Sequence, residues 1–159
     1  MKVLWAPWRM EYISSDDKEG RCIFCPGHDR NHDTERLILR IGKRSIVLMN
    51  RFPYSNGHLL IGPLRHIASL DALSSEETLE IMTMINKAVA ALKAVMHPEG
   101  FNVGLNIGKA AGAGVEGHIH FHVVPRWNGD TNFITICGET RVIPEHIQTT
   151  YRKLLPFFK

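Results

Sequence analysis

The chain has 159 residues, of which 44% are hydrophobic and 22% charged, a composition typical of a globular protein with one packed core. The formal net charge of +3 is far below that of a duplex nucleic-acid binder and suits a ligand that carries a few phosphates. No run of apolar residues is long enough to span a membrane. At this chain length, a single domain over residues 1–159 is expected.

The N-terminal region gives no sign of export or of a disulfide framework. Pro7 and Arg9 interrupt its apolar residues, which excludes the long apolar core of a secretory signal. Cys22 and Cys25 form a Cys-x-x-Cys pair, and Cys137 is left as a small buried hydrophobe or a free thiol. Three cysteines in a chain of this size favour a reducing compartment, so we expect a cytoplasmic protein.

Two strands and a long helix are predicted next. Short apolar runs at 45–50 and 58–62 flank a stretch of turn formers, which is the pattern of adjacent antiparallel strands. The hydroxyl of Ser74 can cap a helix, with Glu77 completing a capping box, and Pro98 ends that helix. The stripe expected to pack against the sheet consists of Ile81, Met82, Ile85, Val89, Leu92 and Met96.

The second half of the chain predicts two further strands, at 101–106 and 118–124, separated by a glycine-rich loop at 108–117. A C-terminal helix is predicted within 143–155, while the remaining segments show no comparable periodicity. This order of elements predicts an α+β fold, in which helices flank an antiparallel sheet.

The densest chemical signal is the alternation of His118, His120 and His122 with apolar residues. A strand period of two places the three imidazoles on one face and the apolar side chains on the other. One metal ion cannot easily bind all three, because the outer Cα atoms of such a strand lie about 13 Å apart. A row of neutral imidazoles instead fits a phosphate chain, with one ring attacking phosphorus and another donating to an oxygen.

The loop before the histidines supplies groups that can bind anionic oxygens. Asn106 offers an amide, and Gly112, Ala113 and Gly114 leave backbone N–H groups accessible. Residues 112–117 also match the Gly-x-Gly-x-x-Gly fingerprint, but a dinucleotide site requires a helix next, and a strand is predicted there. We therefore reject a Rossmann site, and the chain contains no P-loop sequence.

These residues resemble the histidine-triad (HIT) family, whose hallmark is three histidines alternating with apolar residues and then two more apolar residues. The resemblance spans about residues 22–127, which we expect to be the HIT core, with N- and C-terminal extensions. It implies a dimer in which His120 attacks the α-phosphorus of a nucleotide, His122 contacts phosphate oxygens and Asn106 holds the α-phosphate. Asn50 would occupy the place of the ribose-binding residue.

The sequence departs from many family members in the loop, where residues 113 and 114 are alanine and glycine instead of glutamine or a hydroxyl residue. The segments at 5–9 and 125–133 resemble the bacterial branch that includes diadenosine tetraphosphate phosphorylases. Small loop residues leave room for phosphate as acceptor, with Lys109 or Arg126 as a counter-charge. We expect diadenosine tetraphosphate and phosphate to give ADP and ATP, while water stays open as the acceptor.

The motif Cys22-Ile23-Phe24-Cys25 has the spacing of two thiolate ligands on one tetrahedral zinc, although redox pairs share that spacing. The family resemblance, which extends to galactose-1-phosphate uridylyltransferase, implies that His66 and His118 complete the ligand set. A purely local zinc site would use His28 or His32 in place of His66.

Three classes of function are consistent with these features. The first is an enzyme that transfers a nucleotidyl group through a covalent His120 intermediate to water or phosphate. The others are a nucleotide-binding regulatory or scaffold protein with little turnover, and a zinc-stabilised interaction domain. The presence of both His120 and Asn106 favours the enzyme. A separate expectation concerns His58, which should be structural and form hydrogen bonds near the site.

Overall fold

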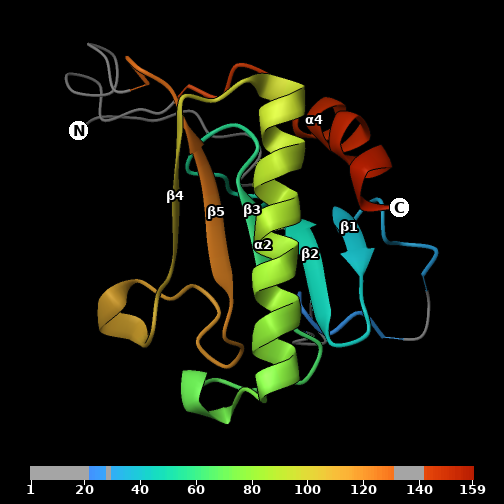
Figure 1. The fold of residues 1–159 in the computed structure, drawn as a ribbon, viewed down its shortest axis with the longest axis vertical. Helices are drawn as coiled ribbons and strands as arrows, with labels where there is room; N and C mark the ends of the chain where they lie inside the picture. The colour runs from blue at the N-terminus through green and yellow to red at the C-terminus, as the bar shows by residue number, and fades with distance from the viewer. Residues whose placement is uncertain (1–21, 28–29, 131–141) are drawn as a thin grey trace, which may run out of the picture.

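The computed structural model describes residues 22–27, 30–130 and 142–159. Its centre is an antiparallel sheet of five strands in the order β1-β2-β3-β5-β4. The strands are β1 (Ile38–Ile41), β2 (Ser45–Met49), β3 (Leu59–Pro63), β4 (Gly100–Leu105) and β5 (Phe121–Arg126). Figure 1 shows β5 between β3 and β4, so the last strand of the sheet in chain order is an interior strand.

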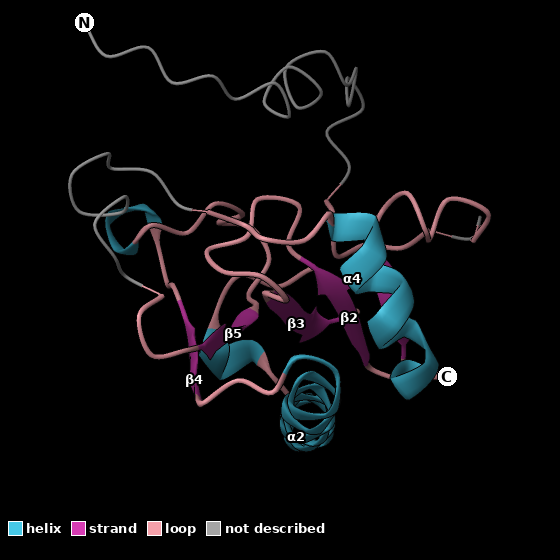
Figure 2. Cartoon of the chain, turned by 90° about the horizontal axis from the view of Figure 1, so that it is seen from above, coloured by secondary structure: helices cyan, strands magenta, loops and turns pink. Residues whose placement is uncertain are grey.

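The longest helix, α2 (Ser75–Met96), packs on one face of the sheet against β2, β3 and β5. The hydroxyl of Ser74 accepts from the Glu77 N–H, and the Glu77 carboxylate accepts from the Ser74 N–H, which confirms the predicted capping box. Figure 2 shows α2 on one side of the sheet and the C-terminal helix α4 (Ile147–Leu154) at the β2 end of it, and Tyr151 and Leu154 of α4 belong to the core that α2 covers. The sheet and its two helices confirm the predicted α+β fold.

The larger apolar core lies between α2 and the sheet. Its buried members on α2 are Ile81, Met84, Ile85, Ala88, Ala91 and Leu92. The prediction for Met82 is wrong, because this side chain is 46% exposed and Met84, at 8%, takes a buried position. Met82 directly follows Ile81 and so points about 100° away from it around the helix, whereas Met84 lies almost one full turn further on. Val89 and Met96 pack at the margin of this core.

Two predicted boundaries are corrected and one strand was not predicted. β5 begins at Phe121, three residues after the predicted start, because the Ile119 N–H donates to the Ile67 carbonyl instead of to a neighbouring strand. The C-terminal helix begins at Ile147, and β1 gave too short an apolar signal to be predicted. The expectations for Cys137, His28 and the segments at 5–9 and 131–133 lie outside the described residues.

The opposite face of the sheet carries a smaller apolar core, made of Phe24, Ile38, Ile46, Leu48 and Leu60. On β5, Val123 belongs to the core under α2, so its neighbour His122 projects from the other face, where it is paired in register with Leu60. The histidines therefore lie on the face that α2 leaves uncovered. Among the described residues, no helix has the length and apolar character needed to cross a membrane.

Candidate active site and metal centre

The three histidines of the triad lie in a row but enter two different environments. The rings of His120 and His122 are neighbours, with centroids 5.0 Å apart. His118 is fully buried and meets the ring of His66 edge to face, with centroids 5.1 Å apart. One end of the row is therefore a cluster of potential metal ligands, and the other end is a pair of imidazoles.

A chain of hydrogen bonds fixes the tautomers at this second end. The backbone N–H of Tyr54 and the side-chain amide of Asn50 both donate to His58 Nδ1, over 3.1 and 3.2 Å. The proton of a neutral His58 ring is therefore on Nε2, which donates to His122 Nδ1 over 2.9 Å. This hydrogen bond leaves the His122 proton on Nε2. The prediction that His58 hydrogen-bonds near the site is confirmed.

His122 Nε2 is buried and has no hydrogen-bond partner in the described part of the chain. Burial, with the neighbouring His120 as a second cause, lowers the pKa of His122 to about 4, so the ring is neutral at pH 7 and retains this N–H. An unsatisfied buried donor costs about 1–3 kcal/mol, and such groups are rare in folded proteins. The N–H therefore marks a position that suits an acceptor oxygen of a ligand.

The ring of His120 is oriented by its own backbone. Its Nδ1–H donates to the carbonyl of His118 over 2.8 Å, so the lone pair of the neutral ring is on Nε2. Burial lowers the pKa of His120, which favours the neutral ring. An imidazole with one nitrogen anchored and the other unprotonated can attack an electrophile without a separate base.

The remaining predicted nucleotide-binding residues lie at the ends of strands and in the loop. Asn106 directly follows Leu105, which pairs with Phe121, so Asn106 adjoins the segment that carries His120. Gly112 ends a short 3₁₀ turn in the left-handed region, with φ of 85°. Within the described residues, neither Asn106 nor residues 112–114 form a hydrogen bond to a triad histidine.

In this structure, the side-chain amide of Asn50 forms hydrogen bonds to other groups of the protein. Its nitrogen donates to His58, and its oxygen accepts from the Phe52 N–H over 2.9 Å. A ribose contact by Asn50 would use its second amide proton or the second lone pair of its oxygen. The residue is thus placed to hold His58 whether or not it also contacts a ligand.

Four predicted metal ligands converge at the His118 end of the row, namely Cys22, Cys25, His66 and His118, with ligand atoms that all lie within 4.8 Å of one another. His118 Nδ1 lies 3.3 Å from both His66 Nδ1 and Cys22 Sγ, and Cys25 Sγ lies 3.5 Å from His66 Nδ1. A tetrahedral zinc has edges of about 3.3 Å between nitrogens and about 3.6 Å between nitrogen and sulfur, from bonds of about 2.0–2.3 Å. These separations fit one such ion.

The outer nitrogen of His118 supports the same assignment. His118 Nε2 donates to the Pro63 carbonyl over 2.8 Å, so the Nδ1 lone pair faces the two cysteines. The local alternative for the third ligand receives no support, because the His32 ring instead hydrogen-bonds to Glu35, and His28 lies outside the described residues.

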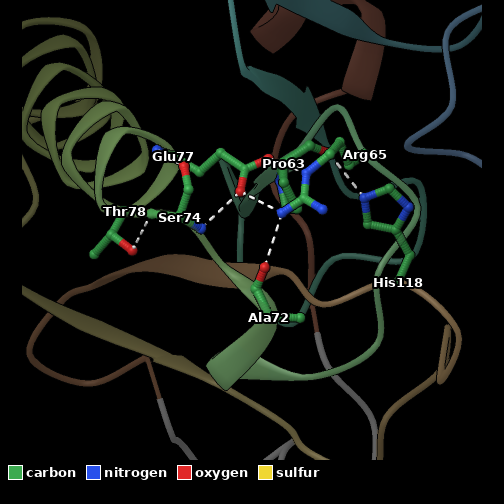
Figure 3. A network of polar contacts seen from close by, with 7 residues as sticks. All are labelled: Pro63, Arg65, Ala72, Ser74, Glu77, Thr78 and His118. Atoms are coloured by element: carbon green, nitrogen blue, oxygen red, sulfur yellow. Dashed lines mark hydrogen bonds and ion pairs between the residues drawn. The ribbon is translucent and has the colours of Figure 1, made fainter.

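Figure 3 shows how the segment after β3 is tied to the start of α2. The Arg65 guanidinium donates to both oxygens of Glu77 over 2.7 Å and to the Ala72 carbonyl over 2.8 Å. Glu77 is only 3% exposed, and its hydrogen bonds with Arg65 lower its pKa to about 2. Pro63, the last residue of β3, accepts from His118 and lies two residues before Arg65, so this ion pair fixes one side of the metal cluster to the helix.

Residues 33–129 match the family model described as the HIT domain. The chain belongs to the HIT domain family. It is 39% identical to AP-4-A phosphorylase of Mycobacterium tuberculosis, over 97% of this chain and 83% of that protein. Adenosine 5'-monophosphoramidase hnt1 of Schizosaccharomyces pombe is 34% identical, over 80% of this chain and 90% of that protein.

A solved structure of a zinc-bound histidine triad family protein from Mycobacterium smegmatis is also similar. It is 27% identical, with a TM-score of 0.62, and the match covers 76% of this chain and 82% of that one. The HIT domain match begins at residue 33 and so includes the triad, His58 and His66. Cys22 and Cys25 precede it, so this HIT protein draws two of its four clustered side chains from outside the matched region.

Proposed function

We propose that this HIT protein transfers a nucleotidyl group from a nucleoside phosphate or dinucleoside polyphosphate to His120, and then to an acceptor. One arrangement carries the proposal: a ring with its lone pair on Nε2 lies beside His122, whose buried N–H has no partner in the described chain. Relatives named AP-4-A phosphorylase, adenosine 5'-monophosphoramidase and bis(5'-nucleosyl)-tetraphosphatase support this substrate class.

In the first step, His120 Nε2 attacks the α-phosphorus and forms a P–N bond, while the P–O bond to the departing phosphate chain breaks. That chain takes the bonding electron pair and leaves as an anion. The Nε2–H of His122 donates to a non-bridging oxygen, where negative charge is held in the transition state. The modified His120 ring carries a positive charge, which its Nδ1–H hydrogen bond to the His118 carbonyl stabilises.

In the second step, an oxygen of the acceptor attacks the same phosphorus, and the P–N bond breaks to restore the His120 lone pair. Asn106, at the end of β4, would hold the α-phosphate in both steps, and Asn50 would contact the ribose. Residues 112–114 would offer backbone N–H groups to phosphate oxygens.

We propose phosphate as the acceptor. Gly112 and Gly114 have only open space where a side chain would project, which leaves room for a phosphate dianion. Of the two predicted counter-charges, Arg126 is already bound to Asp130 over 2.5 and 2.8 Å, so Lys109 is the better choice. The 39% identity to a protein named AP-4-A phosphorylase supports the same acceptor.

The products formed from diadenosine tetraphosphate test the acceptor directly. Transfer to phosphate gives ADP and ATP, whereas transfer to water gives AMP and ATP. We expect ADP to replace AMP as phosphate rises through the millimolar range, as read by anion-exchange chromatography. Lys109→Ala should raise the phosphate concentration at which the two products are equal. If AMP is the sole partner of ATP at every phosphate concentration, the acceptor is water.

The His120→Ala variant separates an enzyme from a nucleotide-binding scaffold. Removal of the nucleophile should lower kcat by about 10³-fold or more and leave nucleotide affinity within a few-fold, because most ground-state contacts remain. Calorimetric titration with a non-hydrolysable nucleotide provides the affinity. A wild-type protein that binds nucleotides but turns over none of a panel of polyphosphates and phosphoramidates would be a scaffold.

We propose zinc as the ion of the Cys/His cluster, held by Cys22, Cys25, His66 and His118. Two thiolates and two imidazoles form a closed tetrahedral set, which is typical of structural zinc. Such an ion contributes folding stability and leaves no coordination position for substrate. The zinc-bound relative from Mycobacterium smegmatis supports this choice of metal.

We also propose a cytoplasmic homodimer in which residues 1–159 form a single domain. β4 is an edge strand of the sheet, and its Val103 side chain is 46% exposed. On α2, Leu79 and Met82 are also 70% and 46% exposed. Apolar side chains beside an open strand edge are suited to contact with a second copy of the chain. Thiolate ligands on zinc are best maintained in a reducing compartment.

A further inference from the structure

Phe24 lies between the two cysteines of the metal cluster and is fully buried. Its ring stacks on that of His120, with centroids 4.7 Å apart and planes 27° apart. The same ring contacts His118, with centroids 5.0 Å apart. One aromatic side chain therefore covers both the residue assigned to the metal and the residue assigned to the chemistry.

The other side of this stack is closed by the backbone of β3. A Cβ atom placed on Gly62 would lie 3.3 Å from Phe24 Cδ1 and 3.6 Å from His120 Cβ. It would also lie 3.0 Å from the Ile119 carbonyl oxygen, closer than real Cβ contacts normally are. Gly62 thus packs closely against the Phe24 ring and the Cβ atom of His120, and a side chain at this position would displace them.

Besides its contact with the neighbouring His122 ring, the His120 ring is restrained in the described chain by one hydrogen bond. The bond from Nδ1–H to the His118 carbonyl fixes one ring nitrogen but allows the ring to swing about that contact. The Phe24 ring, packed against the face of the His120 ring, restricts this rotation and keeps Nε2 directed at the atom that it attacks. Small misplacements of a reacting group cost up to about 10²-fold in rate.

The position of Phe24 depends in turn on the turn that carries it. The Cys25 N–H donates to the Cys22 carbonyl over 3.0 Å, and Arg36 donates to the carbonyls of Ile23, Cys25 and Pro26. These bonds keep the backbone of the turn folded without a metal. The Phe24 ring already contacts His118, and metal ligation through the Sγ atoms of Cys22 and Cys25 would add a rigid link from the turn to both His66 and His118.

We propose that Phe24 is a positioning residue for His120, and that metal binding at Cys22 and Cys25 presses the Phe24 ring onto the nucleophile. This inference rests on the proposed role of His120 in nucleotidyl transfer. It gives the metal, which is remote from the substrate phosphate, an effect on the rate through one apolar contact. The metal would then act on the orientation of a ring rather than on phosphorus.

Phe24→Leu tests the contact, with Phe158→Leu as the matched control. Phe158 is as well buried, at 1%, but lies in the core under α2, on the other side of the sheet. We expect Phe24→Leu to lower the single-turnover rate of His120 modification about 10- to 100-fold, with KM within threefold of wild type. Phe158→Leu should lower Tm to a similar extent and change that rate less than twofold. Equal rate losses in the two variants would overturn the proposal.

The NMR signal of the His120 Cε1–H group provides a readout that needs no turnover. His120→Ala identifies the signal by its absence, and the ring current of Phe24 should displace it in the zinc-loaded wild type. Removal of zinc should move this signal toward its position in Phe24→Leu and broaden it. The same removal should have little further effect in Phe24→Leu, because the two changes act through one contact.

An unchanged His120 signal on removal of zinc from the wild type would overturn the role of the metal, and so would an equal change in Phe24→Leu. The spectroscopic result decides the proposal even if the wild type turns over no nucleotide, an outcome that would disprove only the proposed function. Failure of the inference and failure of the function are therefore seen in different measurements.

Discussion

The proton on His122 Nε2 depends on His58, a residue 64 positions earlier in the chain. Tyr54 and Asn50 fill the Nδ1 position of His58, and this leaves its Nε2 as the donor to His122. The tautomer of a residue in the triad is thus set from the turn between β2 and β3. A neutral His122 ring with the opposite tautomer would direct a lone pair, rather than a proton, toward a phosphate oxygen.

His58→Phe should therefore impair the chemical step more than binding. The substitution keeps a ring of similar size in a fully buried position but removes the donor to His122 Nδ1. We expect kcat to fall about 10²-fold, as when one donor to a developing oxyanion is lost, and KM to change less than threefold. Steady-state kinetics and a Tm measurement check this. A kcat within threefold of wild type in the folded variant would contradict the assignment.

Some residues of the site are readable from sequence and others are not, for a physical reason. The alternation of His118, His120 and His122 follows from the strand period, so their common face could be predicted locally. The function of His58 depends on a contact with His122 that only the pairing of β3 with β5 creates. Phe24 gave no signal, because a single aromatic residue between two cysteines is compatible with many environments.

At the scale of elements, the start of α2 does two things at once. Ser74 and Glu77 close the capping box, which is local and was predicted. Glu77 also accepts from Arg65, which reaches it from the segment after β3. The ion pair between Arg65 and Glu77 could not be predicted from the sequence pattern, because it depends on how the segment after β3 packs against α2. β1 was not predicted for a similar reason, because its strand conformation is stabilised by pairing with β2 and its short sequence has no clear strand pattern.

The depressed pKa of Glu77 makes a prediction about acid stability. Its folded pKa is about 2, against an ordinary value of 4.5, so Glu77 contributes stability above about pH 4.5 that is lost as pH falls toward 2. Metal-free Glu77→Gln should have a Tm about 2–4 °C below that of the metal-free wild type at pH 6, and the gap should close near pH 2. Calorimetry across this range checks it, and a gap that is constant with pH would refute the ionic role.

The metal cluster joins the turn at 22–25 to two other elements, and its zinc content can be measured. We expect about one zinc per purified chain, with Cys22→Ser and His66→Ala each losing most of the metal and lowering Tm by at least about 5 °C. His32→Ala is the control, because His32 is a ligand only in the rejected local site. Unchanged zinc and Tm in both ligand variants would show that the ligand set is wrong.

At the scale of the molecule, the larger apolar core and the candidate active site lie on opposite faces of the sheet. The core under α2 contains most of the large buried aliphatic side chains, and the opposite face holds the triad and the metal cluster. Among the described strands, β4 forms one edge of the sheet, and its Val103 side chain is exposed. A second copy paired at this edge would bury apolar surface without covering β1 at the other edge.

Val103→Glu should therefore weaken the proposed dimer. A charge on the edge strand opposes pairing with another strand, and we expect the dissociation constant of the dimer to rise about 10- to 100-fold. Sedimentation velocity over a range of concentrations measures the effect. Phe157→Glu is the control, because Phe157 is 42% exposed in the C-terminal 3₁₀ segment that contacts β1. Equal dissociation of both variants, or a wild type that is monomeric throughout, would contradict the β4 interface.

The interior place of β5 also has a consequence for synthesis of the protein on the ribosome. β1, β2, β3 and α2 emerge first and can pair and pack with one another, but β4 then lacks its partner, because its neighbour among the described strands is β5. Until residue 126 has left the exit tunnel, the β3 edge stays open and is a site for wrong pairing with other nascent chains. His120, the proposed nucleophile, directly precedes β5, so a chain that stalls before this segment lacks both the strand that closes the edge and the residue proposed to carry the chemistry.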